Sequence, residues 1–168
     1  CDMGWDAHQP ITLPDFDLLQ LAGRELARQH LQEVDPDLLV LSFPCTEWSQ
    51  LQQINQRTPI QIRQLRRRRL EQLHLLALVN EMSQWQASRG RAVLVENPEK
   101  SQAWDTAPMK AMRMHPWINE TGTDMCCYNK RRPDTGNLVK KPTKLCGTTE
   151  ILQNLNHRCN GTHKHERI

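Results

Sequence analysis

The sequence predicts an α/β fold built on an open, mostly parallel sheet. Two short apolar runs, LLVLSF at 38–43 and RAVLV at 91–95, are typical of strands that are buried on both faces. A long helical pattern at about 60–88 lies between them, and this strand, helix, strand order favours a parallel pair. The length of 168 residues suits one hydrophobic core.

The first part of the chain is expected to be irregular, because Pro10 and Pro14 interrupt any long element. From about Leu18 the apolar residues recur at helical spacing, with Gly23 as a weak point in the helix. The turn residues at 35–37 end this helix and lead into the first strand.

The second half is less regular. Beyond a polar, Gln-rich segment, the helix at about 60–88 carries one apolar stripe, and Gly90 suits its C-terminal cap. The strand at 91–95 runs into Glu96-Asn97-Pro98. The other expected elements are a short helix at about 101–114, a strand near 124–128 and a short helix near 148–157, separated by basic, loop-like sequence.

The composition excludes several classes of protein. No apolar run is long enough to cross a bilayer, so we expect no membrane span. The N-terminal CDMGWDAHQP is no signal peptide and has no initiator Met, so the chain is expected to be a piece of a longer intracellular protein, cytoplasmic or nuclear. Six cysteines in such a setting favour thiol chemistry or metal binding over disulfides.

Charge is clustered although the net charge is only +3. Either of two basic clusters could meet the phosphates of a nucleic acid, or could simply be a solvated surface. The clusters are Arg66 to Arg69 and the group Lys130, Arg131, Arg132, Lys140, Lys141 and Lys144.

Both expected strands end in chemically useful residues. Cys45 follows the first strand and Glu96 the second, and carboxyl ends of parallel strands meet at one edge of a sheet. A thiolate at Cys45 is a carbon nucleophile, and a carboxyl group beside it could protonate a heterocycle nitrogen. Taken singly, Cys45 could equally be a small buried side chain and Glu96 a turn cap.

The segment from Asp35 to Ser49 resembles the catalytic Pro-Cys segment of cytosine-5 DNA methyltransferases. Phe43, Pro44, Cys45 and Ser49 match it, and the run from Val93 to Asn97 is similar to that family's Glu-Asn-Val strand. The chain resembles most closely the divergent methyltransferase-like proteins of phages and mobile elements, which tend to carry a Lys-Pro-Thr stretch and a Cys/His tail.

The resemblance implies a Rossmann-like methyltransferase core, N-terminally truncated, that acts on DNA, with RNA as an open alternative. Cys45 would attack C6 of a flipped-out cytosine, and Glu96 would bind N3 and the exocyclic amine. Ser49 and Asn97 belong to the same two motifs. Arg131 or Arg132 would match the family's basic motif near the flipped base.

S-adenosylmethionine is the cofactor that the resemblance implies. The family's Gly-rich loop, Phe-x-Gly-x-Gly, is absent, so only part of the cofactor site is expected. Candidates for it are Trp5 and Asp6 near the start of the chain and Phe43 and Pro44 after the first strand.

The tail contains a candidate metal site. Cys159, His163 and His165 form Cys-x3-His-x-His, ligand types that suit tetrahedral zinc. The fourth ligand could be Cys126, Cys127, Cys146 or His157, and an exposed basic tail without a metal is the alternative.

We therefore expect a partial catalytic core at 1–122 and a basic, Cys/His-containing segment of the same domain at 123–168. The expected function is methyl transfer to C5 of cytosine through a cysteine adduct. The alternative is an inactive fragment, or a zinc-containing module, that binds nucleic acid or a protein partner.

Overall fold

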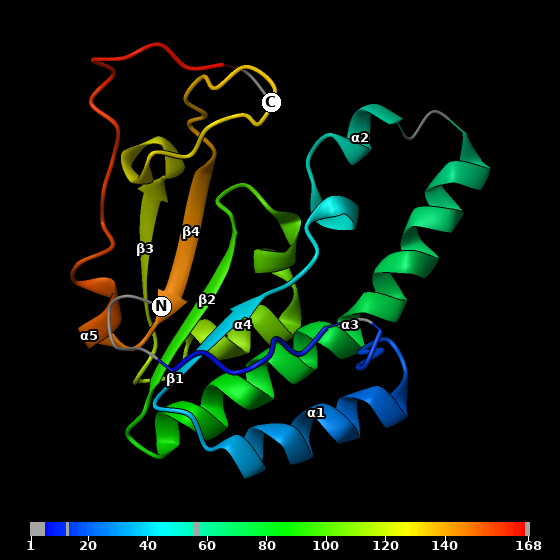
Figure 1. The fold of residues 1–168 in the computed structure, drawn as a ribbon. Coiled ribbons are helices and arrows are strands. Elements are labelled where there is room, and N and C mark those ends of the chain that lie inside the picture. Colours follow the sequence, from blue (N-terminus) through cyan, green and yellow to red (C-terminus); the bar gives the residue numbers. More distant parts are fainter. Residues whose placement is uncertain (1–5, 13, 56–57, 167–168) are drawn as a thin grey trace. The chain divides into compact units, whose positions relative to one another are not determined.

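The computed structural model describes residues 6–12, 14–55 and 58–166. By its internal contacts the chain divides into two compact units, residues 1–35 and 36–168, and each is described by itself. The second unit holds the sheet (Figure 1). Among the described helices, none combines the length and apolar character that a bilayer crossing needs.

The first unit contains one helix, α1 (Leu21–Val34). It begins later than the expected Leu18 because a turn precedes it, in which the amide of Gln20 donates to the Asp17 carbonyl at 2.9 Å. A Cβ at Gly23 would lie 2.1 Å from that same carbonyl oxygen, so the glycine allows the turn to fold onto the helix. The helix ends at Asp35, which adopts a left-handed φ of 46°.

The second unit is built on a four-stranded sheet in the order β1-β2-β4-β3. Its strands are β1 (Leu38–Ser42), β2 (Ala92–Pro98), β3 (Asn119–Asp124) and β4 (Pro142–Gly147). The expected parallel pairing of the two apolar runs is confirmed, with Leu38 opposite Ala92 and Ser42 opposite Glu96.

The expectation of a mostly parallel sheet is wrong, because β4 is antiparallel to both β2 and β3. A connection without a crossover helix joins β3 to β4, and such a connection returns the chain antiparallel. β3 therefore runs in the same direction as β1 and β2, and the carboxyl ends of these three strands lie at one edge of the sheet. The fold is mixed α/β.

The long helix α3 (Pro59–Ser88) connects β1 to β2 and confirms the helix expected at 60–88. It begins with a capping box, in which the hydroxyl of Thr58 accepts from the Gln61 amide and the Gln61 side chain accepts from the Thr58 amide. Gly90 follows its end with a φ of 70°. α3 packs against β1, β2 and α4 (Figure 1).

The core lies between these helices and one face of the sheet. Buried side chains of the strands, among them Val93 and Val95, meet buried side chains of α3 and α4, among them Leu76 and Met109. This burial removes apolar surface from water and fixes the direction of β1 and β2, whose carboxyl ends carry the candidate catalytic residues.

Three expected elements differ from the structure. The helix expected at 101–114 is split at Thr106, which is extended, into the 3-10 turn Gln102–Asp105 and α4 (Ala107–Arg113). The strand expected near 124–128 is instead β3, and Met125–Tyr128 is a 3-10 turn. The helix expected near 148–157 is only the single turn α5 (Thr149–Leu152).

Candidate active site and metal centre

Cys45 lies in the turn that follows β1. Its carbonyl oxygen accepts a hydrogen bond from the amide of Trp48 at 3.1 Å, which starts the 3-10 turn Thr46–Trp48. The Trp48 side chain is buried, and the guanidinium of Arg69 on α3 lies 5.2 Å from the centre of its ring. The turn is thereby anchored to α3, while Cys45 itself stays partly exposed.

Glu96 and Asn97 at the end of β2 have opposite orientations, because successive side chains of a strand alternate between its faces. Asn97 is 1% exposed and donates through Nδ2 to the Phe43 carbonyl at 2.7 Å. It therefore fixes the backbone that leads into Cys45. Glu96 accepts from the Ser42 hydroxyl at 3.0 Å and pairs with the Lys141 ammonium at 3.4 Å.

A pocket of about 230 Å³ lies beyond the strand ends. Both Cys45 and Ser49 contribute to its wall, and so does Pro98 of β2. Glu96 lies two residues before Pro98, on the same face of β2, and is not one of the residues that line the pocket. The other residues of the wall are Gln50, Leu51, Lys100 and Ser101.

The two candidate arginines are engaged within the loop that follows β3. Arg131 donates to the Asn129 side chain and to the Gly136 carbonyl, at 2.9 and 2.8 Å. Arg132 forms a two-pronged ion pair with Asp134 and also faces the carboxylate of Glu166. Neither of these arginines is therefore the cation that pairs with Glu96.

That cation, Lys141, was missed as a site residue by sequence reasoning. It has a φ of 35°, a left-handed conformation that residues other than glycine seldom adopt, and it precedes Pro142, which restricts it further. Strained backbone of this kind is concentrated at functional sites. A Lys-Pro-Thr stretch is visible in the sequence, but its backbone conformation and its contact with Glu96 are not.

Of the residues expected to hold S-adenosylmethionine, the structure describes Phe43, Pro44 and Asp6. Phe43 is buried, and its ring packs edge-on against Trp104 at 5.8 Å, so it has no free face for a cofactor. Pro44 and Asp6 are exposed. Trp5 lies outside the described residues.

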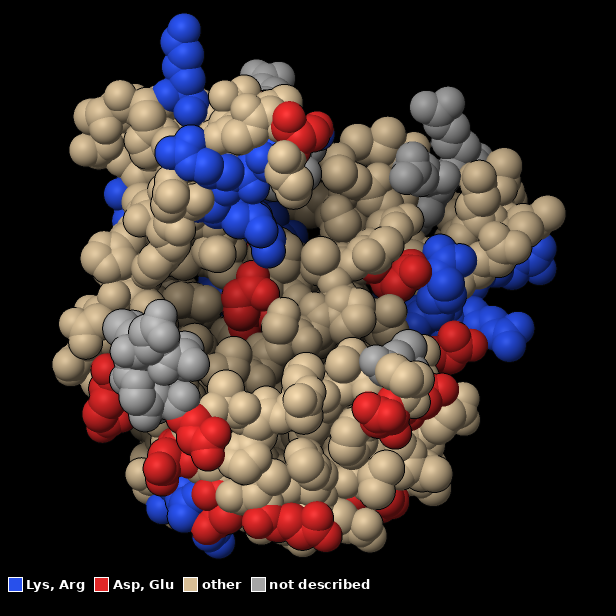
Figure 2. Space-filling model, in the orientation of Figure 1, with Lys and Arg blue, Asp and Glu red and all other residues tan. Residues whose placement is uncertain are grey.

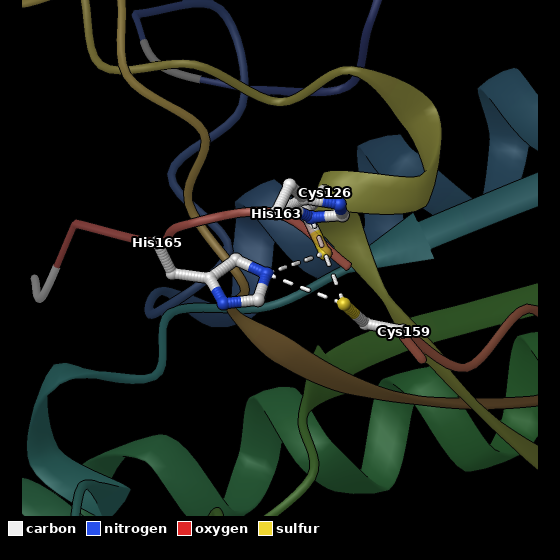
Figure 3. Close-up of side chains that lie close together, drawn as sticks. All are labelled: Cys126, Cys159, His163 and His165. Carbon is white, nitrogen blue, oxygen red and sulfur yellow. Dashed lines mark hydrogen bonds between the residues drawn. The ribbon is translucent and has the colours of Figure 1, made fainter. Parts of the chain in front are cut away.

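The expected metal ligands do come together. Cys126, Cys159, His163 and His165 place one ligand atom each within 4.8 Å of the others and could hold a metal ion. Figure 3 shows the ring of His165 beside the two sulfur atoms with Nε2 facing both, and Nε2 lies 3.3 Å from each sulfur. Nε2 of His163 lies 3.6 Å from the Cys159 sulfur.

These distances match a tetrahedral zinc site. With Zn–S near 2.3 Å and Zn–N near 2.05 Å, tetrahedral angles place sulfur and nitrogen ligands about 3.5 Å apart. Of the candidates for a fourth ligand that the sequence left open, Cys126 in the 3-10 turn after β3 is the one that lies in this cluster. Cys146 is buried within β4, and the ring of His157 is bonded to the Asn154 carbonyl.

Backbone hydrogen bonds support the cluster from both sides. The buried carboxylate of Asp124 accepts from the Cys159 amide at 2.9 Å, and the Asp124 amide donates to the His157 carbonyl at 2.8 Å. The amide of Gly161 donates to the Cys159 sulfur at 3.3 Å. Burial raises the pKa of the Cys126 thiol to about 11, so a metal ion would have to displace its proton.

Comparison with known proteins assigns the chain to no family. A scan against models of protein families gave no match, and neither did searches of the curated proteins and of the solved structures. The function is therefore argued from the site itself.

Proposed function

We propose that the chain acts on cytosine in DNA by cytosine-5 methyltransferase chemistry, with Cys45 as the nucleophile in a Rossmann-like catalytic core. One observation carries the proposal. In the register of the parallel pair Glu96 lies opposite Ser42, and the Ser42 hydroxyl donates to the Glu96 carboxylate at 3.0 Å. Ser42 directly precedes the Phe43-Pro44-Cys45 turn. A thiol just after β1 and a carboxyl group near the end of β2 thus lie at the same edge of the sheet, where Cys45 lines a pocket.

The residues would divide the first step between them. The Cys45 sulfur forms a bond to C6 of an extruded cytosine, and the electron pair of the C5=C6 bond moves toward C5 and N3. Glu96 would bind N3 and the exocyclic amine and so stabilise the covalent intermediate. Asn97 orients the Cys45 turn through the Phe43 carbonyl and touches no substrate.

The rest of the reaction concerns C5. Once C6 carries the sulfur, C5 is nucleophilic and takes a methyl group, after which it loses its proton and the C6–S bond breaks. S-adenosylmethionine would supply that methyl group, as the resemblance implies. The part played by this chain's own residues is the addition to C6 and its reversal.

Addition can be measured without a methyl donor. When C5 takes a proton from water instead of a methyl group, reversal of the addition exchanges the hydrogen at C5 with solvent. We expect the chain to release tritium from DNA labelled at cytosine C5. Cys45→Ser should abolish the release, and Glu96→Gln should slow it by about 10²–10⁴-fold.

The matched control is Cys127→Ser, which removes another exposed thiol. It should leave tritium release unchanged. Release that persists in Cys45→Ser, or DNA binding with no release by the unaltered chain, would reject the proposed chemistry.

We also infer that the Cys/His cluster holds zinc, in a structural role. The supporting observation is that one ligand atom of each of the four residues lies within 4.8 Å of the others, and that two sulfurs and two imidazole nitrogens are a donor set of structural zinc sites. Cobalt(II) in place of zinc should give the visible absorption of a tetrahedral thiolate site. Cys159→Ser should lose it and Cys127→Ser should keep it; a chain that binds no metal would contradict the inference.

The second candidate function follows from this cluster. One ligand atom of each of its four residues lies within 4.8 Å of the others, whereas Phe43, a residue expected for the methyl donor, is buried with its ring against Trp104. If DNA binds but the hydrogen at C5 does not exchange, the chain is a zinc-held module that binds nucleic acid.

A further inference from the structure

The loop between β3 and β4, residues 129–141, forms a hairpin of its own, here called the basic hairpin. The Val139 amide donates to the Lys130 carbonyl at 2.9 Å, and the Arg132 amide to the Asn137 carbonyl at 3.0 Å. Gly136, with a φ of 68°, allows the tight turn at its tip. The long loop therefore has a definite backbone.

Several cations of the basic hairpin keep charge available to solvent. Lys130 is exposed, and Lys140 is about half exposed, 3.7 Å from Asp124. Arg131 donates only to neutral oxygens, so its positive charge is not compensated by them. Arg132, by contrast, is neutralised by Asp134 and Glu166. Figure 2 shows Lys and Arg side chains gathered above β4, next to acidic side chains.

The tail contacts the basic hairpin at Glu166. The Glu166 amide donates to the Leu138 carbonyl at 2.9 Å, and the Glu166 carboxylate accepts from Thr135 and Asn137 across the turn. Val139 and Glu166 form a parallel bridge. The shape of the hairpin thus depends on where the tail is held.

The Cys/His cluster is what holds the tail there. Three of its ligands lie in the tail between Cys159 and His165, and the fourth, Cys126, lies at the base of the hairpin. Next to Cys126, the amide of Met125 donates to the Lys140 carbonyl at 2.7 Å. A metal ion would therefore tie the tail to the base of the hairpin and to Lys140.

We propose that the basic hairpin is a docking surface for the phosphate backbone of DNA, and that the metal ion in the Cys/His cluster fixes the geometry of this surface. DNA as the partner rests on the proposed function. The placement supports it, because Lys141, at the end of the hairpin, contacts Glu96 beside the candidate active site. Phosphates bound by the hairpin would hold the duplex next to Cys45, and they would do so independently of base sequence.

The test is DNA binding in a Cys45→Ser background, which separates it from the chemistry at C5. Anisotropy of a labelled DNA duplex is measured over a series of salt concentrations, with zinc and after chelation. With zinc removed we expect the association constant for DNA to fall about tenfold. The negative slope of its logarithm against log salt should become shallower by about two, as for the loss of two phosphate contacts.

Two double variants decide whether the hairpin is responsible. Lys130→Gln with Lys140→Gln should weaken binding and remove most of its dependence on zinc. The matched control, Arg66→Gln with Arg67→Gln on α3, changes the charge equally and should keep the full dependence. Circular dichroism verifies that each variant is folded. Removal of zinc by a chelator tests the same dependence in a chain whose hairpin is unaltered.

Equal affinity with and without zinc would overturn the proposal, and so would full zinc dependence in the hairpin variant. Zinc-dependent binding, together with no exchange at C5 by the chain that retains Cys45, would reject the proposed chemistry and leave the docking surface standing. Loss of exchange together with unchanged, zinc-independent binding would reject both.

Discussion

Replacing Asn97 by alanine should destabilise the protein by about 1–3 kcal/mol. The change removes the donor of the 2.7 Å hydrogen bond to the Phe43 carbonyl, at a position that is 1% exposed. A buried carbonyl left without its partner costs about 1–3 kcal/mol, and the space left by the side chain adds to this. The Oδ1 atom of Asn97 accepts no hydrogen bond from the described residues, so its removal offsets part of the loss.

The measurement is urea unfolding, with the free energies of unfolding compared at equal slope. Asn119→Ala is the matched control, because its side chain also donates one hydrogen bond, to Thr149 at 2.8 Å, but at an exposed position. It should change stability by less than about 0.5 kcal/mol. If Asn97→Ala costs no more than Asn119→Ala, Asn97 does not hold the Cys45 turn.

Three further predictions concern other sites. Lys141→Gly should leave the free energy of unfolding unchanged or raise it, because glycine removes the backbone strain at φ 35°. The partly exposed ion pair with Glu96 that is lost contributes at most about 1 kcal/mol. The variant should nevertheless slow exchange at cytosine C5, and a large loss of stability in urea unfolding would contradict this. Iodoacetamide at neutral pH should label the exposed Cys127 and spare Cys146, because burial raises the pKa of the Cys146 thiol to about 12. Peptide mass spectrometry measures the labelling, and equal labelling of the two cysteines would contradict the buried position of Cys146. The hydrogen bond from Arg158 lowers the pKa of Glu99. This carboxylate therefore stabilises the fold above its unfolded pKa, and the contribution is lost as pH falls through the folded pKa. Glu99→Gln should lose less stability in acid than the unaltered chain, by less than about 1 kcal/mol because the pair is partly exposed, and an unchanged dependence of stability on pH would contradict this.

The parallel pair and the metal ligands were predictable from the sequence because their signals are local. LLVLS and AVLV are short, dense apolar runs, which mark them as strands. The expected burial on both faces is wrong, because Leu39, Val93 and Val95 are buried whereas Val40 is 57% exposed. Cys159, His163 and His165 lie within one short stretch, so a shared site requires little of the fold. Only the choice of Cys126 depended on the path of the chain after β3.

The remaining strands were not predictable, because their stability depends on distant partners. β3 reads NETGTD, and Asn119 and Glu120 are exposed, so no apolar alternation marks it as a strand. β4 is placed by pairing with β2 and β3 on its two sides. At Gly147 a Cβ would lie 2.1 Å from the Val93 carbonyl oxygen, a close approach that sequence spacing does not reveal.

Among the candidate site residues, too, local sequence signals were predictable and contacts with distant partners were not. Cys45 and Glu96 were predicted from the strand ends that they follow, whereas Lys141 reaches Glu96 only through a left-handed backbone before Pro142. The engagement of Arg132 with Asp134 was visible as a short spacing of opposite charges, but its second partner, Glu166, comes from the far end of the tail.

The most direct test of the central claim is to identify the atom that bonds to the base. A duplex in which the target cytosine is replaced by pyrimidin-2-one, a base open to addition at C6, is incubated with the chain, and the covalent complex is digested and mapped by mass spectrometry. The account predicts that the base is carried by the peptide containing Cys45 and that Cys45→Ser gives no complex. A complex through another cysteine, or none with a chain that binds the duplex, would contradict it.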